Sequence, residues 1–344
     1  MKKRTLLWLL LFPILAAVTL WAVVSFTKGF SWADFRHYLS IMSPGWLAAA
    51  IAAMVSYVFW EGFSLRFICS RLGYTPPLRH CLCWSAADIF FSAITPSATG
   101  GQPAAALLML RDKVPGHMCT VSLLLNLIQY TLSILVIGPV AFLLSPKLAA
   151  GFHPVSLWLV GIGFVIQLLL SALFILLMLR PGMVLWVADR GLRLLQALRL
   201  LRNGDKRRAS LAAKMPVYHE CAQAVKQDWK LLLGSFLFNL LQRFSMLLVP
   251  VCVYLGTGGR PRCVPRILAV QSCVVLGSNA APLPGAMGLA DYLFLDGYSH
   301  LVHDTVSMEL LSRGISFYGC FLLCGLVVLA GRILAGIQRK REVQ

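Results

Sequence analysis

Long apolar runs, separated by short loops that hold most of the basic residues, constrain this chain more than any other feature. Of its 344 residues, 58% are hydrophobic and only 13% are charged, whereas about 25% are charged in a typical globular domain. A membrane-spanning helix needs about 20 apolar residues, so the length accommodates six full spans and two shorter hairpins. We therefore predict an all-α polytopic membrane protein, with residues 1–344 forming one integral membrane domain.

The expected spans are joined by mostly short loops, which favours a simple multi-pass arrangement. They cover residues 5–27, 46–69, 117–144, 154–179, 231–255 and 306–337. The first run follows a basic N-terminus but is long for a signal sequence, so we interpret it as a retained span. Cytoplasmic loops carry an excess of lysine and arginine, and the basic residues at both ends of the chain therefore predict two cytoplasmic termini.

The longest loop, about residues 180–230, is strongly basic and has leucines at helical spacing. This pattern predicts an amphipathic helix on the anionic cytoplasmic leaflet. The net charge of +18 is thus better explained by membrane orientation and lipid contact than by nucleic-acid binding. No metal-binding spacing and no phosphate-binding loop occurs in the sequence, so we expect no metal and no cofactor.

Two apolar regions are too short to cross a membrane and are interrupted by small, polar and helix-breaking residues. The first break spans residues 92–103 and the second residues 278–291. Backbone groups freed by proline and glycine are tolerated at membrane depth only inside protein or beside water, so we expect both breaks to share one polar centre. The first hairpin would enter from the cytoplasm and the second from outside, which predicts inverted halves of about residues 1–144 and 154–344.

The candidate substrate-binding residues lie in these breaks and in the helices beside them. N-termini of half helices present free N–H groups to a phosphate, although a kink packed on its neighbours would also use glycines for close approach. The candidates are Asp88, Thr95, Pro96, Ser97, Thr99, Gly100, Gly101, Gln102, Gln242, Arg243, Asn279, Pro282, Pro284, Gly285, Gly288 and Asp291.

Arg243 is the one basic residue that these spans place well within a membrane helix. A charge there is costly unless it faces a bundle interior or water. It could neutralise a lipid phosphate, or it could form a structural ion pair with Asp88, Glu61 or Asp291, and the sequence leaves both readings open. Asp88 and Asp291 could likewise accept a basic headgroup or a proton, or be structural and hydrated.

The two breaks carry a family resemblance. The run Thr95-Pro-Ser-Ala-Thr-Gly-Gly-Gln-Pro-Ala, the run Pro282-Leu-Pro-Gly-Ala-Met-Gly-Leu-Ala-Asp and the hydropathy plan resemble the transmembrane region of lysylphosphatidylglycerol synthases and their stand-alone flippase-like relatives. The likeness implies movement of a lipid, such as aminoacylated phosphatidylglycerol, between leaflets. Gln102 and Asp291 depart from the pattern, because many relatives have glutamate at both places.

The leading hypothesis is therefore a lipid flippase-like transporter of a bacterial plasma membrane, not an enzyme, with a headgroup held between the two hairpins. The expected partners are membrane phospholipids and a separate lipid-synthesising enzyme, and homo-oligomers are left open. A membrane-embedded lipid-modifying enzyme, using Asp88, Glu61 or Asp291 as acid or base, is one alternative. A scaffold that recruits an enzyme through the basic loop is another.

Overall fold

The described part of the chain is helical throughout its regular elements. The computed structural model describes residues 32–95, 98–145, 151–180, 219–279, 281, 284–286 and 288–341, together with positions 182, 183, 186 and 190. The predicted first span, most of the basic loop and three candidate residues (Pro96, Ser97 and Pro282) lie outside these ranges.

Five helices in these ranges are long and apolar enough to cross a membrane, which confirms the all-α polytopic class. They are α3 (Pro44–Arg71), α6 (Gly116–Leu144), α7 (Pro154–Leu179), α10 (Trp229–Gly256) and the joined run α13 (Thr305–Arg313), η5 (Gly314–Gly319) and α14 (Cys320–Arg341). Each begins and ends within a few residues of a predicted span, except that the last run reaches Arg341. In an apolar helix of this length, the backbone N–H and C=O groups are hydrogen-bonded to one another within the helix, as a membrane requires.

The shorter helices are α2 (Trp32–Ile41), α4 (Leu78–Ile94), α5 (Gly101–Arg111), η3 (Pro261–Cys263), α11 (Val264–Ser278), η4 (Pro284–Ala286) and α12 (Leu289–Tyr298). Among them, α4 and α5 flank the first predicted break, and α11 and α12 flank the second. The paired helices have 17 and 11 residues on either side of the first break and 15 and 10 around the second. At 1.5 Å per residue, every one of them is shorter than the roughly 30 Å hydrocarbon core.

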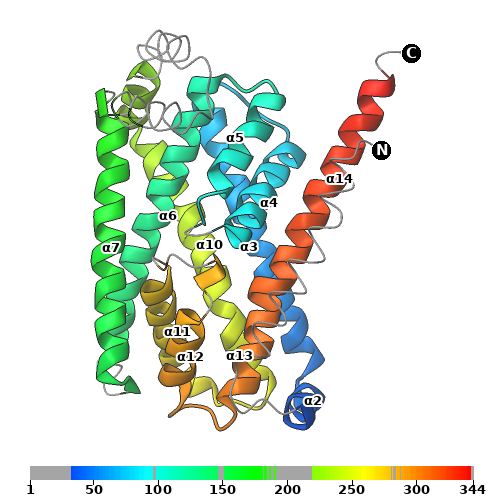
Figure 1. Cartoon of the computed structure of the whole chain (residues 1–344), viewed down its shortest axis with the longest axis vertical. Coiled ribbons are helices and arrows are strands. Elements are labelled where there is room, and N and C mark those ends of the chain that lie inside the picture. Colours follow the sequence, from blue (N-terminus) through cyan, green and yellow to red (C-terminus); the bar gives the residue numbers. More distant parts are fainter. Residues whose placement is uncertain are drawn as a thin grey trace.

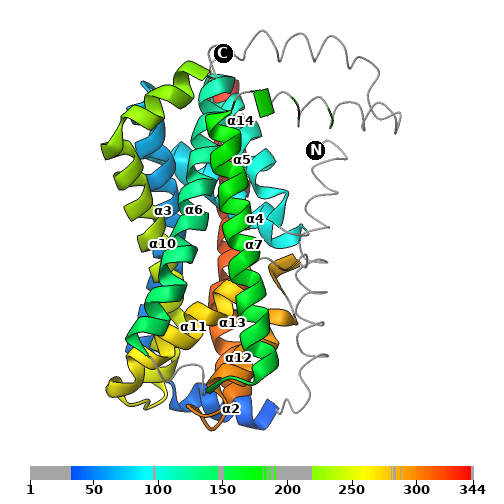
Figure 2. The same ribbon diagram turned by 90° about the vertical axis from the view of Figure 1, so that its left-hand side faces the viewer.

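The two short pairs occupy opposite halves of the bundle (Figure 1), where α4 packs on α5 and α11 packs on α12. Helix α3 lies along α10, and both flank the region between the pairs. Helix α4 also contacts η4 in the second break, so the two breaks approach each other near mid-height. Seen from the side, α7 runs along nearly the full height of the molecule (Figure 2).

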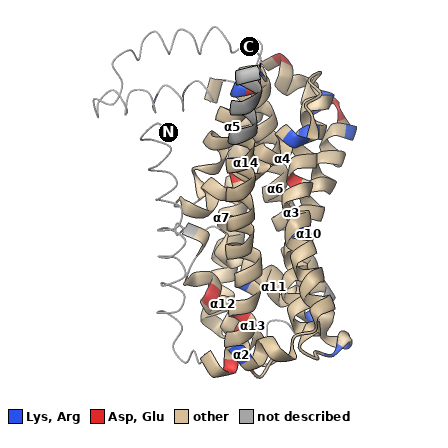
Figure 3. Ribbon diagram, turned by 90° about the vertical axis from the view of Figure 1, so that its right-hand side faces the viewer, with Lys and Arg blue, Asp and Glu red and all other residues tan. Residues whose placement is uncertain are grey.

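Charged residues lie mainly toward the two ends of the bundle (Figure 3), where their side chains can be hydrated. A few acidic residues lie at intermediate height. The long helices pack mainly through buried apolar residues, and buried serine, asparagine and glutamine side chains among them can form interhelical hydrogen bonds.

One such polar cluster joins the middle of three spans. Ser64 Oγ on α3 donates to Asn126 Oδ1 on α6 at 2.7 Å, and Asn239 Nδ2 on α10 donates to both of these oxygens at 3.0 Å. All three side chains are buried. About one helical turn farther along each helix lie Glu61, Tyr130 and Arg243. The cluster therefore fixes three side chains of the polar centre relative to one another.

Candidate functional site

Both breaks line a single cavity of about 580 Å³ in the middle of the bundle. Thr99 and Gln102 come from the first break, Asn279 and Gly285 from the second, and the remaining walls from the long helices. The structure thus brings the two breaks together, as the sequence predicts. The volume of the cavity falls within the range of about 300 to 1,000 Å³ that is common for small-ligand pockets.

Local hydrogen bonds and one close glycine contact hold the first break in shape. Thr95 Oγ1 accepts the Gly100 N–H at 2.8 Å and donates to the Phe91 carbonyl at 2.7 Å. A methyl group at Gly101 would overlap both the Asp88 carboxylate and the Ser92 hydroxyl. The second glycine of the motif is therefore needed for close approach, because α5 begins directly against the acidic side chain of α4.

Asp88 and Glu61 form a buried carboxyl pair on the cavity wall. Gln102 Nε2 donates to Asp88 Oδ2 at 2.7 Å, and Gln242 Nε2 on α10 donates to Glu61 Oε2 at 2.9 Å. Both carboxyl groups are buried and line the same cavity. Gln102 thus holds Asp88 without adding a third acidic group.

Arg243 faces the same cavity and is surrounded by aromatic rings. Its guanidinium donates to the Tyr57 hydroxyl at 2.7 Å and lies over the Tyr130 ring, 4.0 Å from the centroid. No described carboxylate lies within 4.0 Å of it, so the structure shows no direct ion pair with Asp88, Glu61 or Asp291. Its Nε is buried and has no hydrogen-bond partner.

A chain of hydrogen bonds links the second break to two spans. Tyr130 Oη on α6 donates to Asn279 Oδ1 at 2.7 Å, and Asn279 Nδ2 donates to Gln167 Oε1 on α7 at 3.0 Å. Gln167 is 1% exposed and lines the cavity, and its Nε2 has no partner. The sequence analysis missed Gln167, although an amide in the middle of the apolar run 154–179 is a signal that could have found it.

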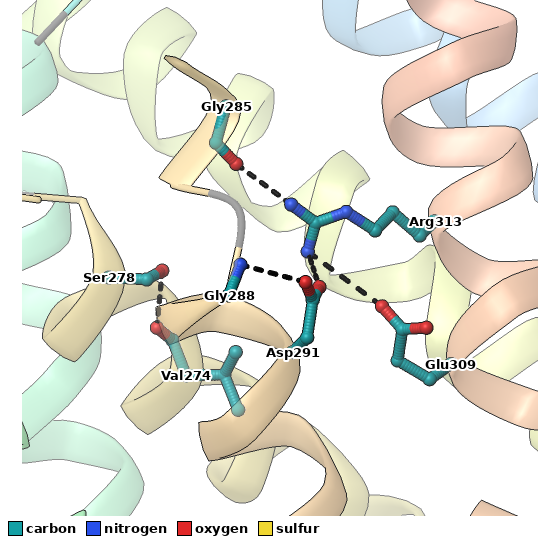
Figure 4. A network of polar contacts seen from close by, with 7 residues as sticks. All are labelled: Val274, Ser278, Gly285, Gly288, Asp291, Glu309 and Arg313. Carbon is teal, nitrogen blue, oxygen red and sulfur yellow. Dashed lines mark hydrogen bonds and ion pairs between the residues drawn. The ribbon is translucent and has the colours of Figure 1, made fainter. Parts of the chain in front are cut away.

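The far side of the second break is held by an ion cluster that the sequence analysis also missed (Figure 4). Arg313 on α13 donates to the Asp291 carboxylate and to the Gly285 carbonyl, the latter at 2.9 Å. Glu309 lies 3.7 Å from Arg313 on the same helix, and the Gly288 N–H donates to Asp291 at 2.8 Å. Arg243 is therefore not the one basic residue within a span, and the spacing of Glu309 and Arg313 by four residues was the available signal.

The predicted residues divide into those that line the cavity and those that support it. Thr95, Gly100 and Gly101 shape the first break, while Asp291 and Gly288 anchor the second from behind. The cavity is lined by Asp88, Thr99, Gln102, Gln242, Arg243, Asn279 and Gly285. Pro284 opens η4 beside it. Within the described residues, no group of three histidine, cysteine or acidic side chains is placed to hold a metal ion.

Comparison with known proteins gives one family. A family model described as the lysylphosphatidylglycerol synthase TM region matches residues 8–324, which is most of the chain and includes both breaks. A search of curated proteins gave no match.

Proposed function

This chain is a member of the lysylphosphatidylglycerol synthase transmembrane family, and we propose that it moves a phospholipid between the two leaflets of a bacterial plasma membrane. It is a multi-pass membrane protein. In this proposal the protein transports lipid and does not alter it chemically. The headgroup occupies the cavity between the two breaks.

The observation that carries the proposal is Arg243, a cation in the cavity with no described carboxylate within 4.0 Å. Placing an arginine at membrane depth costs at least about 2.5 to 3.5 kcal/mol unless polar groups or an anion meet it. A lipid phosphodiester gives Arg243 a direct anionic partner and accepts the buried Nε proton that has no partner. The side-chain amide of Gln167 provides a second free donor on the same cavity.

The same cavity also offers the complementary chemistry. Asp88 and Glu61 are acidic groups in the same cavity, and a headgroup amine is attracted to such groups. An aminoacylated phosphatidylglycerol has both a phosphate and amines, so it fits this arrangement. Other phospholipids that carry one phosphate and a polar headgroup fit the Arg243 side equally.

The short helix pairs support a re-entrant path for the backbone. Neither α4 with α5 nor α11 with α12 contains a helix long enough to cross, and both pairs bring their breaks to the same cavity. We place the first pair on the cytoplasmic side and the second outside, with both termini in the cytoplasm.

Reconstitution tests the proposal directly. Purified protein in liposomes with fluorescent phospholipids should speed leaflet exchange, measured as the fraction of label that dithionite bleaches from outside. Mass spectrometry of the recovered lipids is the control, because an enzyme would change their masses. Absence of exchange across anionic, zwitterionic and aminoacylated lipids would refute the transport function, and a changed mass would favour the lipid-modifying alternative.

A further inference from the structure

We propose that the Glu61 and Asp88 carboxyl pair takes up or releases a proton to balance the net charge of the bound headgroup, so that lipid movement is coupled to protons. The inference rests on the proposed lipid transport and adds a driving force to it. An anionic lipid would travel together with a proton, and a cationic lipid would exchange for one.

The charges that line the cavity imply the proton. Two buried carboxyl groups, Glu61 and Asp88, share the cavity with a single described cation, Arg243, so a neutral cavity requires one proton on the pair. Each carboxyl group accepts a hydrogen bond from an amide, that of Gln102 or Gln242, at 2.7 and 2.9 Å, and amides do not titrate. The pair therefore holds one proton and one negative charge, with the capacity to gain or lose a proton.

The groups around the pair balance that single charge. Arg243 is the only cation among the described residues that line the cavity, and its positive charge offsets the negative charge of the pair. The titratable and charged groups facing the pair from the packed helices are Tyr57 on α3, Tyr130 on α6, Arg243 on α10, and Cys320 and Cys324 on α14. With both tyrosines and both cysteines neutral, the empty site carries no net charge.

A charged headgroup disturbs this balance. Charges interact strongly in a site shielded from water, and two acidic groups side by side cannot both ionise easily without a cation. A phosphodiester at Arg243 adds one negative charge, which favours a second proton on the pair. A headgroup with a net positive charge favours loss of the shared proton instead. In both cases the loaded site returns to neutrality.

Proton counting on the purified protein tests the pair without requiring transport. In weakly buffered detergent solution, short-chain phosphatidylglycerol should cause uptake of about one proton per bound lipid. Short-chain phosphatidylethanolamine, which is neutral overall, should cause none, and short-chain lysylphosphatidylglycerol should release about one. Binding of phosphatidylglycerol without any proton uptake would overturn the proposal.

Two variants assign the proton to the pair. Glu61→Gln combined with Asp88→Asn removes both titratable groups but keeps side chains of similar shape, and any lipid that this protein binds should cause no proton change. Asp228→Asn alters a carboxylate at the start of α10, where it meets Arg71, and should leave proton uptake as in the wild type. Proton uptake that persists in the double variant would assign the proton to another group and overturn the proposal.

A pH gradient across liposomes then separates coupling from transport. With the outside acidic, fluorescent phosphatidylglycerol should accumulate in the inner leaflet, and its bleachable fraction should fall below one half; nigericin should restore equal distribution. Exchange that ignores the gradient would refute coupling and leave the transport function intact. Absence of exchange with or without the gradient would refute transport, and the proton count alone would then decide whether the pair responds to headgroup charge.

Discussion

Arg313 binds the carboxylate of Asp291, a residue 22 positions earlier in the chain that lies in the first turn of α12. The same guanidinium donates to the Gly285 carbonyl in the second break. One side chain of the last span therefore fixes both the break and the helix that follows it. The first break has no comparable described ion pair and is held by Thr95 and by the close contact at Gly101.

Arg313→Gln should lower the stability of the protein by roughly 2 kcal/mol. This is less than the 3 to 5 kcal/mol typical of breaking a fully buried pair, because the Asp291 side chain is 25% exposed. Thermal unfolding in detergent measures the loss. Adding Asp291→Asn should recover part of it, since no acidic charge is then left at that position. A double variant as unstable as the sum of its single changes would contradict the pairing.

Gly101→Ala should separate α4 from α5 and abolish lipid exchange, because the added methyl group would overlap Asp88 and Ser92. The matched control is Gly161→Ala on α7, where an added methyl group meets no atom within 4 Å. This control should retain exchange and equal or exceed the wild type in stability, since alanine favours a helix by up to about 1 kcal/mol. Equal exchange by both variants would show that the close approach is unnecessary.

Arg243→Gln should reduce lipid exchange at least about tenfold while leaving the unfolding temperature near that of the wild type, because no ion pair is lost. Arg243→Lys should rescue only part of the activity, since ammonium lacks the planar fork that guanidinium offers to a phosphate. Arg71→Gln, which breaks an exposed ion pair with Asp228, is the control and should retain exchange. Misfolding of Arg243→Gln, relieved by a second change at Glu61 or Asp88, would end the phosphate-binding role.

Two changes at Tyr130 should have separable effects. Tyr130→Phe keeps the ring beneath Arg243 but removes the hydrogen bond to Asn279, so stability should fall by about 1 kcal/mol with lipid affinity nearly unchanged. Tyr130→Leu also removes the aromatic face, and its dissociation constant for short-chain phosphatidylglycerol should rise about fivefold. Unfolding temperature and lipid titration report the two effects. Equal lipid affinities for both variants would show that the Tyr130 ring does not contribute to lipid binding.

The proposed orientation predicts opposite accessibility at the two ends of the bundle. The loop between α5 and α6 and the turn η3 lie at opposite ends (Figure 1). In a background without reactive native cysteines, Lys113→Cys should be labelled only from the cytoplasm, and Arg262→Cys and His303→Cys only from outside. Labelling of Arg262→Cys from the cytoplasm would contradict the inverted arrangement of the two helix pairs.

The helices and the breaks could be predicted from the sequence because both depend on local chemistry. Apolar length specifies a span, and proline and glycine specify where a helix stops, so α3, α6, α7 and α10 begin and end close to the expected residues. The second break was equally visible from its proline and glycine residues. The shared cavity followed from the need to satisfy freed backbone groups.

The partners of the polar residues could not be predicted, because they come from helices far apart in the chain. Gln242 meets Glu61 across 181 positions, and Arg243 meets Tyr57 across 186. A single sequence does not show which residues far apart in the chain contact each other in space. The two readings of Arg243 stayed open for this reason, since hydropathy marks a buried charge but does not say whether a carboxylate or an aromatic ring contacts it.

The π-helical turn η5 lies between Arg313 and Phe321, and the number of residues in it sets the directions in which these two side chains point. Each residue of an α-helix turns the chain by about 100°, and the wider π turn shifts every later residue of α14 relative to α13. This offset lets Arg313 face the second break while Phe321 stacks on Phe90 of α4, with ring centroids 4.7 Å apart. Deleting one residue here would rotate α14 as a whole, so this turn should not tolerate a change of length.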